Sequence, residues 1–314
     1  MQQSIDPAAE KEVRLRPDFL IPGVGKSGTS SLYAYLRAHP AIYMTPRKEP
    51  GFFNWDGAEF SYRGPVDERL YLAATRTIED YEALFEARQH EAVAGEATPN
   101  YLYNEGAAER AYRRYPDLKL VIILRDPVDR LYSHYLHMKR MGDEPLSLTS
   151  ALKAEPLRRA RGYGPSYHYL SQGFYKAQIE RFVSRFGWER TRIFLFEDLS
   201  RDPLSVVQSI YAFLGVDDRV IPPIGEVHNA FYEPRSKALN ALVMKDGAIK
   251  RAAKAAVPDS LRARASSLIR RMNGAPKPEL DPAIRAELKA LYRPEIVALE
   301  RYLDRDLSAW YSGD

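Results

Sequence analysis

Residues 19–31 limit the possible folds of this chain more than any other stretch, because a short apolar run there meets a glycine-rich loop and then a helical pattern. Glycines allow the backbone to approach an anion closely, and the N–H groups at the start of a helix favour negative charge. Lys26 adds a positive charge to this loop. Hydroxyl donors come from Ser27, Thr29, Ser30 and Ser31. The stretch predicts a phosphate-binding turn between a strand and a helix, and a tight turn capped by serine and threonine is the alternative.

The position of the lysine argues against the common nucleotide-triphosphate loop. Gly23 and Gly28 have the glycine spacing of the pattern G-x-x-x-x-G-K-[ST], but Thr29 occupies the position of its lysine. If Gly25 to Ser27 is taken as the G-K-S instead, Leu20 replaces the first glycine. Because Lys26 precedes the last glycine, an ordinary nucleotide triphosphatase is the weaker interpretation.

Strands and helices are predicted to alternate along the chain. Apolar runs predict strands at residues 19–21, 41–44, 93–96, 118–124 and 191–196. Helical spacing predicts helices at residues 32–36, 78–85, 106–115, 127–138, 171–186, 203–214 and 282–304. Residues 45–55 and 142–170 are expected to be loops, because they contain prolines and glycines among polar residues. The pattern predicts an α/β fold of three layers, P-loop-like, with a central parallel sheet flanked by helices.

Composition limits the class of protein further. The 314 residues contain no cysteine, which excludes disulfides and thiol catalysis and is compatible with a cytoplasmic location. The polar start lacks an apolar signal segment, so residues 1–16 are expected to form a loose arm. Residues 17–314 are expected to form one domain, with 238–314 mainly helical. The net charge of +4 suits an anionic ligand without requiring nucleic acid.

A basic segment covers residues 237–271, where lysines and arginines recur and acidic residues are few. One interpretation is the solvated face of a helix. The other is a surface for an anionic acceptor or for membrane headgroups. The sequence alone leaves both open.

Five motifs follow one another along the chain: GKSGTSSLY from Gly25, KEPGFF from Lys48, EATPNY from Glu96, LRDPVDRLYSHY from Leu124, and GFY from Gly173 with QIERF from Gln178. In this order they resemble the motifs of the sulfotransferases that use 3′-phosphoadenosine 5′-phosphosulfate (PAPS). The similarity is greatest to the bacterial and heparan-sulfate N-sulfotransferase-like branch. Together the motifs cover about residues 17–237. The resemblance implies the α/β fold predicted above and PAPS as the donor, with 3′-phosphoadenosine 5′-phosphate (PAP) as the product.

The resemblance also implies roles for single residues. Lys26 would hold the phosphosulfate and stabilise the departing phosphate, and Glu49 matches the carboxylate that the family uses as its base. His137 matches a histidine near the acceptor in the N-sulfotransferase branch. The remaining donor-binding residues implied are Ser27, Gly28, Thr29, Ser30 and Ser31 for the 5′-phosphate, and Arg125, Ser133, Arg235 and Lys237 for the 3′-phosphate. The predicted fold supports Arg125 and Ser133, since a strand end and the following helix meet at one crevice.

The chemistry of sulfuryl transfer agrees with these parts. An in-line displacement needs the leaving phosphate to be stabilised and the acceptor O–H or N–H to lose a proton. Lys26 fits the first task, and either Glu49 or His137 fits the second. No metal is expected, because lysine, arginine and backbone donors neutralise the leaving group. Glu49 paired with Arg47 or Lys48 as a plain loop carboxylate is the structural alternative.

The main functional alternative is a nucleotide-dependent phosphotransferase or kinase of the P-loop class, and a non-catalytic anion-binding or membrane-surface module is the third hypothesis. The kinase interpretation needs magnesium ligands and a lysine after the second glycine, and neither is evident. The acceptor is expected to be a small molecule, a glycan or a lipid, and no nucleic-acid partner is expected.

Overall fold

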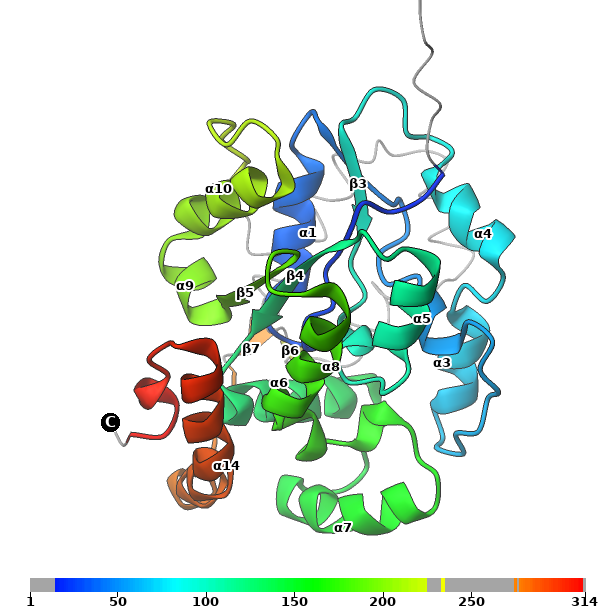
Figure 1. The fold of residues 1–314 in the computed structure, drawn as a ribbon. Coiled ribbons are helices and arrows are strands. Elements are labelled where there is room, and N and C mark those ends of the chain that lie inside the picture. The colour runs from blue at the N-terminus through cyan, green and yellow to red at the C-terminus, as the bar shows by residue number, and fades with distance from the viewer. Residues whose placement is uncertain (1–14, 225–232, 235–273, 276, 313–314) are drawn as a thin grey trace, which may run out of the picture. The chain divides into compact units, whose positions relative to one another are not determined.

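Five parallel strands form the central sheet of the computed structural model, in the order β2-β3-β1-β4-β5 (Figure 1). They are β1 (Phe19–Leu20), β2 (Ile42–Met44), β3 (Val93–Glu96), β4 (Lys119–Leu124) and β5 (Thr191–Leu195). The central strand β1 pairs on both sides, with Phe19 opposite Gly95 of β3 and Lys119 of β4. The predicted fold class, a parallel sheet flanked by helices, is therefore confirmed.

The structure describes residues 15–224, 233–234, 274–275 and 277–312. The chain divides into two units, Met1–His228 with Ala283–Asp314, and Asn229–Pro282. In the second unit, β6 (Glu233–Pro234) and β7 (Gly274–Ala275) form a short antiparallel pair. Most of the predicted N-terminal arm and the basic segment 237–271 lie outside the described residues. The proposed single domain over residues 17–314 stays a prediction.

Helices cover both faces of the sheet. Those of the first unit are α1 (Thr29–Arg37), α2 (Phe52–Trp55), α3 (Asp67–Ala73), α4 (Ile78–Glu82), α5 (Ala107–Arg114), α6 (Pro127–Met141), α7 (Leu148–Ala160), α8 (Tyr175–Phe186), α9 (Phe196–Arg201), α10 (Pro203–Leu214) and α14 (Pro282–Leu303). On one face α1 and α10 pack together over the sheet, and Leu32, Ile210 and Leu214 belong to the same buried cluster as Val121 and Ile123 of β4.

Strand β4 shows why the sheet is buried on both sides. Val121 and Ile123 point toward α1 and α10. Leu120, Ile122 and Leu124 alternate with them, so they point to the opposite face, and they too are fully buried. The near-continuous apolar run of this strand is typical of a parallel strand covered by helices on both faces.

Helix α6 begins as the sequence predicts. The Asp126 carboxylate accepts hydrogen bonds from the backbone N–H groups of Val128 (2.7 Å) and Asp129 (3.1 Å). Pro127 occupies the first turn, where no intrahelical N–H bond is lost. This cap fixes the direction in which α6 leaves the end of β4.

Two segments predicted as loops contain helices. Residues 142–170 include α7, a helix of 13 residues with Pro156 inside it. Only Ala151 and Glu155 of this helix are buried, so it has no apolar stripe that the sequence could reveal. Residues 45–55 end in the short helix α2, whose Phe52 and Phe53 are fully buried in the core.

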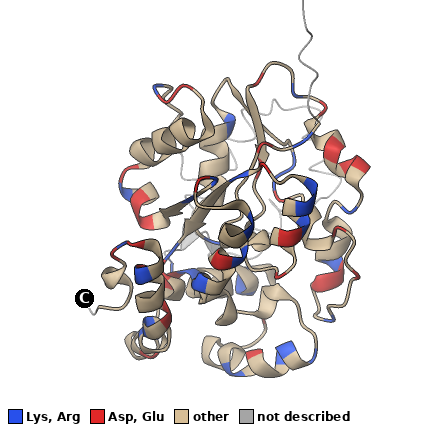
Figure 2. Ribbon diagram, in the orientation of Figure 1, with Lys and Arg blue, Asp and Glu red and all other residues tan. Residues whose placement is uncertain are grey.

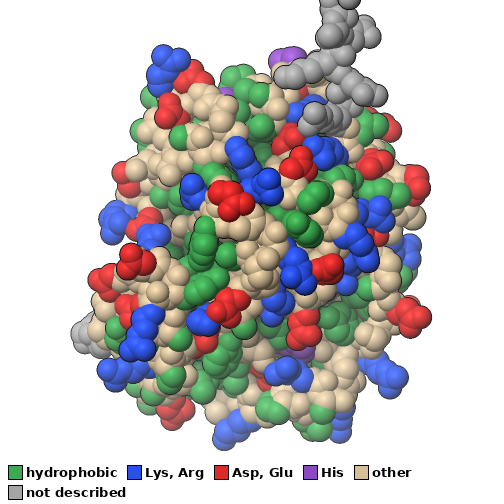
Figure 3. Space-filling model, in the orientation of Figure 1, with side chains coloured by type: hydrophobic (Ala, Val, Ile, Leu, Met, Phe, Trp, Pro, Cys, Tyr) green, Lys and Arg blue, Asp and Glu red, His purple; other side chains and the backbone are tan. Residues whose placement is uncertain are grey.

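Charged groups of both signs are interspersed on the described surface. Figure 2 shows acidic and basic residues along the same helices, including α14. In the face shown in Figure 3, hydrophobic side chains lie scattered between charged ones. Among the described helices, none has the length and apolar character needed to cross a bilayer.

Candidate functional site

The loops that follow β1, β2 and β4 meet at one edge of the sheet, because the carboxyl ends of parallel strands lie together. The later strands lie on both sides of β1 in the sheet: β2 and β3 on one side, and β4 and β5 on the other. Such a switch point forms a crevice between the loops after the central strands. Here those loops carry Lys26 and Arg125.

The Lys26 loop has a strained backbone. Lys26 has φ 75°, and Gly28, which precedes the first residue of α1, has φ 86°. A positive φ is uncommon for a residue with a side chain and costs about 1–3 kcal/mol. No side chain caps the start of α1. The loop is tied to the sheet by the Val24 N–H, which donates to the Ile123 carbonyl at 3.3 Å.

The ring of Phe196, the first residue of α9, lies under this loop. A Cβ atom added at Gly28 would come within 2.8 Å of Phe196 Cδ2, so the backbone at Gly28 rests directly on the ring. The same ring lies 4.4 Å from the Arg125 guanidinium carbon. Phe196 therefore contacts both the Lys26 loop and Arg125, which follows β4.

Arg125 connects the two loops at the switch point. Its Nη1 donates to the Lys26 carbonyl at 3.0 Å, and its own carbonyl accepts from the Tyr175 hydroxyl at 2.9 Å. The Arg125 Nε is buried without a hydrogen-bond partner. Its ion pair with Asp129 is long, at 4.0 Å, and Asp129 also pairs with Arg285 of α14 at 3.0 Å. The guanidinium is therefore held in place while keeping donor capacity for an anion.

The Lys26 ammonium lies in a positively charged, desolvated environment. Burial, followed by the charges of Arg140 and Arg125, lowers the pKa of Lys26 to about 8. The Glu49 carboxylate opposes this shift by raising the same pKa. The structure therefore places Arg125, Arg140 and Glu49 close enough to Lys26 to affect its charge. A bound anion would raise the pKa of Lys26 back toward its ordinary value.

Glu49 follows β2 at the same edge and also has a strained backbone, with φ 60°. Its carboxylate forms an ion pair with Lys48 and is about half exposed, with a relative side-chain accessibility of 51%. Its backbone N–H donates to the Ala97 carbonyl at 3.1 Å. The pairing with Lys48 that the sequence left open is thus present, and the carboxylate still reaches solvent.

His137 lies on α6 near Lys26 and Arg140. The pKa of His137 is lowered to about 4, mainly by burial and further by the charges of Lys26 and Arg140. Its Nδ1 lies 3.1 Å from Arg140 Nη2. Because a guanidinium only donates hydrogen bonds, Nδ1 must accept, and the proton of the neutral ring is on Nε2. His137 therefore has an N–H group to donate at neutral pH.

The other predicted donor-binding residues differ in accessibility. Ser27 is fully buried, and its Oγ has no hydrogen-bond partner. Thr29 is also buried, whereas Ser30 and Ser31 are partly exposed in the first turn of α1. Ser133 is partly exposed on α6. Arg235 and Lys237 lie outside the described residues.

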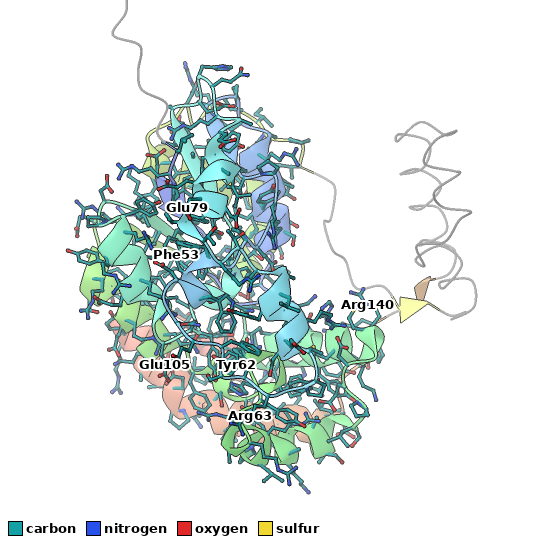
Figure 4. All side chains as sticks on the ribbon, turned by 90° about the vertical axis from the view of Figure 1, so that its right-hand side faces the viewer. Phe53, Tyr62, Arg63, Glu79, Glu105 and Arg140 are labelled. Atoms are coloured by element: carbon teal, nitrogen blue, oxygen red, sulfur yellow. The ribbon has the colours of Figure 1, made fainter. Side chains whose placement is uncertain are left out.

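Two residues near Lys26, Arg140 and Phe196, were not predicted from the sequence. Arg140 follows His137 by three residues on one helix, a spacing that places both on the same face and was visible in the sequence. Figure 4 shows Arg140 at the edge of the described unit and Phe53 inside it. Phe196 immediately follows β5, so its place at the carboxyl edge was also predictable, but its contact with Gly28 depends on the packing of α9.

A separate cleft of about 580 Å³ opens beside α7. It is lined by Ser61, Tyr62, Pro156, Arg159, Gly162, Tyr163 and His168. His168 is satisfied within the wall, since its Nδ1 and Nε2 lie 2.9 Å from the Tyr103 hydroxyl and 2.8 Å from the Tyr163 carbonyl. Tyr62, Arg63 and Glu105 lie on this side of the molecule (Figure 4). None of the predicted site residues lines this cleft. In the described ranges, no cluster of three or more His, Cys, Asp or Glu side chains is placed to hold a metal ion.

Comparison with known proteins gives one consistent result. The model of the Sulfotransferase family matches residues 17–219. A mouse (Mus musculus) bifunctional heparan sulfate N-deacetylase/N-sulfotransferase 4 is 30% identical over 217 residues, which are 66% of this chain and 23% of that protein. The chain thus spans about a quarter of the length of that relative. A mouse heparan sulfate glucosamine 3-O-sulfotransferase 6 is 27% identical over 88% of this chain and 69% of its own length.

A solved structure resembles nearly the whole chain. The crystal structure of a sulfotransferase from Alicyclobacillus acidocaldarius is 34% identical in sequence and has a TM-score of 0.74. The match covers 95% of this chain and 99% of that one. The similarity therefore extends beyond the motifs to the arrangement of the fold.

Proposed function

Since the chain belongs to the PAPS-dependent sulfotransferase family, we propose that it transfers the sulfuryl group of PAPS to a hydroxyl or amine of its acceptor, with Lys26 and Glu49 as the catalytic pair. The family decides between the sulfotransferase and kinase interpretations in favour of the first.

The observation that carries the proposal is the strained backbone at Lys26 and Glu49. They are two of the three non-glycine residues with positive φ in the described ranges, and both lie at the carboxyl edge of the sheet. Strain of this kind persists where the surrounding structure enforces it, and it concentrates at functional sites. The two side chains also have opposite charges, and the charge of Glu49 raises the pKa of Lys26.

We propose that the Lys26 loop and Arg125 hold the donor. The start of α1, with Gly28 in place of a capping side chain, favours a phosphate. The Arg125 guanidinium, anchored on the Lys26 carbonyl and the Phe196 ring, would hold the second phosphate of the nucleotide. Ser133, Arg235 and Lys237 remain candidate ligands of that phosphate. Neutralisation by lysine, arginine and backbone donors supports a reaction that uses no metal.

The chemistry assigns different tasks to Glu49 and His137. PAPS supplies the sulfuryl group, and its phosphate is the leaving group. Lys26 would donate to the oxygen that gains charge as the S–O bond breaks. Glu49, a carboxylate with access to solvent, would accept the proton that the acceptor loses as its new bond to sulfur forms. His137 has its Nδ1 occupied by Arg140, so it would donate through Nε2–H rather than act as the base.

A glycan with free hydroxyl or amino groups is the first acceptor to test. Two of the relatives above are named for heparan sulfate, and a small alcohol, amine or lipid is the alternative. Peripheral membrane contact through residues 237–271 and a cytoplasmic location are also proposals that rest on sequence alone.

The proposal is tested by incubating the full chain with radiolabelled PAPS and a panel of acceptors, including desulfated heparan-type oligosaccharides, simple phenols and amines. Label should appear on one acceptor class as PAP forms in equal amount. Glu49→Gln should lower the transfer rate by about a hundredfold or more and leave PAP affinity unchanged, because only the proton acceptor is lost. Lys26→Ala should lower both.

Two results would refute the assignment. If Glu49→Gln retained the wild-type rate on the same acceptor, Glu49 would not be the base. If His137→Ala, rather than Glu49→Gln, abolished transfer with PAP affinity intact, the tasks of the two residues would be reversed.

A further inference from the structure

The turn at residues 96–101 is built against the Glu49 loop. Three alternate backbone N–H groups of residues 49–53, which are this loop and the first two residues of α2, donate to the turn: Glu49 to the Ala97 carbonyl (3.1 Å), Gly51 to Thr98 Oγ1 (3.3 Å) and Phe53 to the Tyr101 hydroxyl (3.3 Å). Because they come from alternate residues, the contacts hold the loop up to the start of α2.

The acceptor groups of this turn are rigid. Thr98 and Tyr101 have relative accessibilities of 3% and 1%. The Thr98 hydroxyl donates its proton to Glu96 Oε2 at 2.8 Å, so its lone pairs are oriented toward Gly51. Glu96 is fully buried, and its backbone carbonyl accepts from the Ile21 N–H at 2.9 Å. The same turn therefore contacts the segment that leads to the Lys26 loop.

The Glu49 loop needs such support. Glu49 has φ 60° and Gly51 has φ 75°, so two positive-φ residues lie within three positions. A backbone of this kind relaxes unless neighbouring groups hold it. A shift of about 1 Å in a catalytic group costs about a hundredfold in rate.

We propose that Thr98 and Tyr101 are positioning residues, which hold the backbone of residues 49–53 so that the Glu49 carboxylate stays at the edge of the sheet beside Lys26. This inference rests on the proposed role of Glu49. It goes beyond that role in assigning a task to the EATPNY motif, whose buried hydroxyls have no access to a substrate. They act through the loop and not on the reacting atoms.

The chemistry of the buried carboxyl agrees with this assignment. Burial is the largest cause of a raised pKa at Glu96, to about 7, and the charge of Glu49 adds to it. The two carboxyls are thus close enough to interact. In either protonation state, a Glu96 carboxyl oxygen accepts the bond from Thr98.

The test compares Thr98→Val with Thr98→Ser and Tyr101→Phe in the full chain. Valine removes the hydroxyl and keeps the shape, whereas serine restores the hydroxyl. Thr191→Val is the matched control, since Thr191 is equally buried (1% accessible) and its hydroxyl donates to the Gly187 carbonyl of another loop. Hydrogen–deuterium exchange of the amides of residues 49, 51 and 53 is measured with kcat, acceptor KM and the Kd of PAP.

Thr98→Val should speed amide exchange at residues 49–53 and lower kcat by about tenfold, with the Kd of PAP within about twofold of wild type. Thr98→Ser should recover most of both, Tyr101→Phe should show a smaller change of the same sign, and Thr191→Val should change neither. A Thr98→Val protein with wild-type exchange and kcat would overturn the inference, as would a kcat loss that serine does not recover. If instead the wild-type chain transfers no sulfate, the proposed function fails, and the amide exchange still decides whether the turn holds the loop.

Discussion

Binding of PAP should depend on pH through Lys26. In the ligand-free protein, burial and the charges of Arg140 and Arg125 lower the pKa of Lys26 to about 8 from an ordinary value of 10.5. At about 1.4 kcal/mol per pH unit, this difference is worth about 3 kcal/mol. An anionic phosphate beside the ammonium favours the charged form, so the nucleotide should raise the pKa toward its ordinary value or above.

The protonation of Lys26 determines the sign and the size of the change in PAP affinity. At pH 7 most Lys26 side chains are already charged, whereas at pH 9 about nine in ten must take up a proton before they can pair with the phosphate. The Kd of PAP should therefore rise about tenfold from pH 7 to pH 9. The phosphates of PAP lose their last protons near pH 6, so they do not titrate in this range. Burial lowers the pKa of His137 to about 4, so this ring does not titrate there either.

Calorimetric titration of PAP in buffers with different ionisation enthalpies measures the proton uptake. At pH 8 the expected value is about half a proton for each PAP bound. Lys26→Met serves as the control, because it keeps the length of the side chain without the charge; its weaker binding should not vary between pH 7 and pH 9. Constant affinity in the wild type, or the same pH slope in both proteins, would refute the assignment of Lys26 to the phosphate.

Three further predictions concern stability and hydrogen bonding. Because the pKa of Lys26 is lower in the folded protein than in the unfolded chain, its charge destabilises the folded state below pH 8, and this penalty disappears as pH rises toward 10.5. Lys26→Met should therefore raise the Tm of the ligand-free protein at pH 7. A lower Tm would contradict this. Gly28→Ala, whose new Cβ would lie 2.8 Å from Phe196 Cδ2 at φ 86°, should destabilise the protein by about 1–3 kcal/mol in denaturant unfolding, whereas Gly25→Ala, which meets nothing within 4 Å, should not. If His137 donates a hydrogen bond, His137→Gln should keep at least about ten times the kcat of His137→Ala, and equal losses would show that no donor is needed.

The sequence predicted the fold well where local pattern and tertiary context agree. The apolar run of β4 and the Asp126–Pro127 cap of α6 are local signals, and the structure has both where they were expected. Helix α7 was not predicted because one of its two buried residues, Glu155, is polar. The Glu155 carboxylate accepts hydrogen bonds from the backbone N–H groups of Leu170 and Ser171. These contacts depend on how the chain folds back after α7, which the apolar spacing of a segment does not show.

The candidate site shows the same limit. The loop chemistry around Lys26 could be read from glycine, lysine and hydroxyl spacing, and the edge that it shares with Arg125 follows from strand order. The left-handed backbone at Lys26 and Glu49 could not be predicted from the sequence, since residues with side chains rarely adopt it. Nor does the sequence reveal that Arg140 Nη2 lies 3.1 Å from His137 Nδ1, the contact on which the proposed donor role of His137 rests.

A crystal structure of the full chain with PAP would show directly whether the Lys26 loop and Arg125 hold the nucleotide. We expect the 5′-phosphate at the start of α1 beside the Lys26 ammonium, the 3′-phosphate on the Arg125 guanidinium, and the Glu49 carboxylate facing the position of the transferred sulfur. PAP bound elsewhere, such as in the cleft lined by Tyr62 and Arg159, with the Lys26 loop unoccupied, would contradict this expectation.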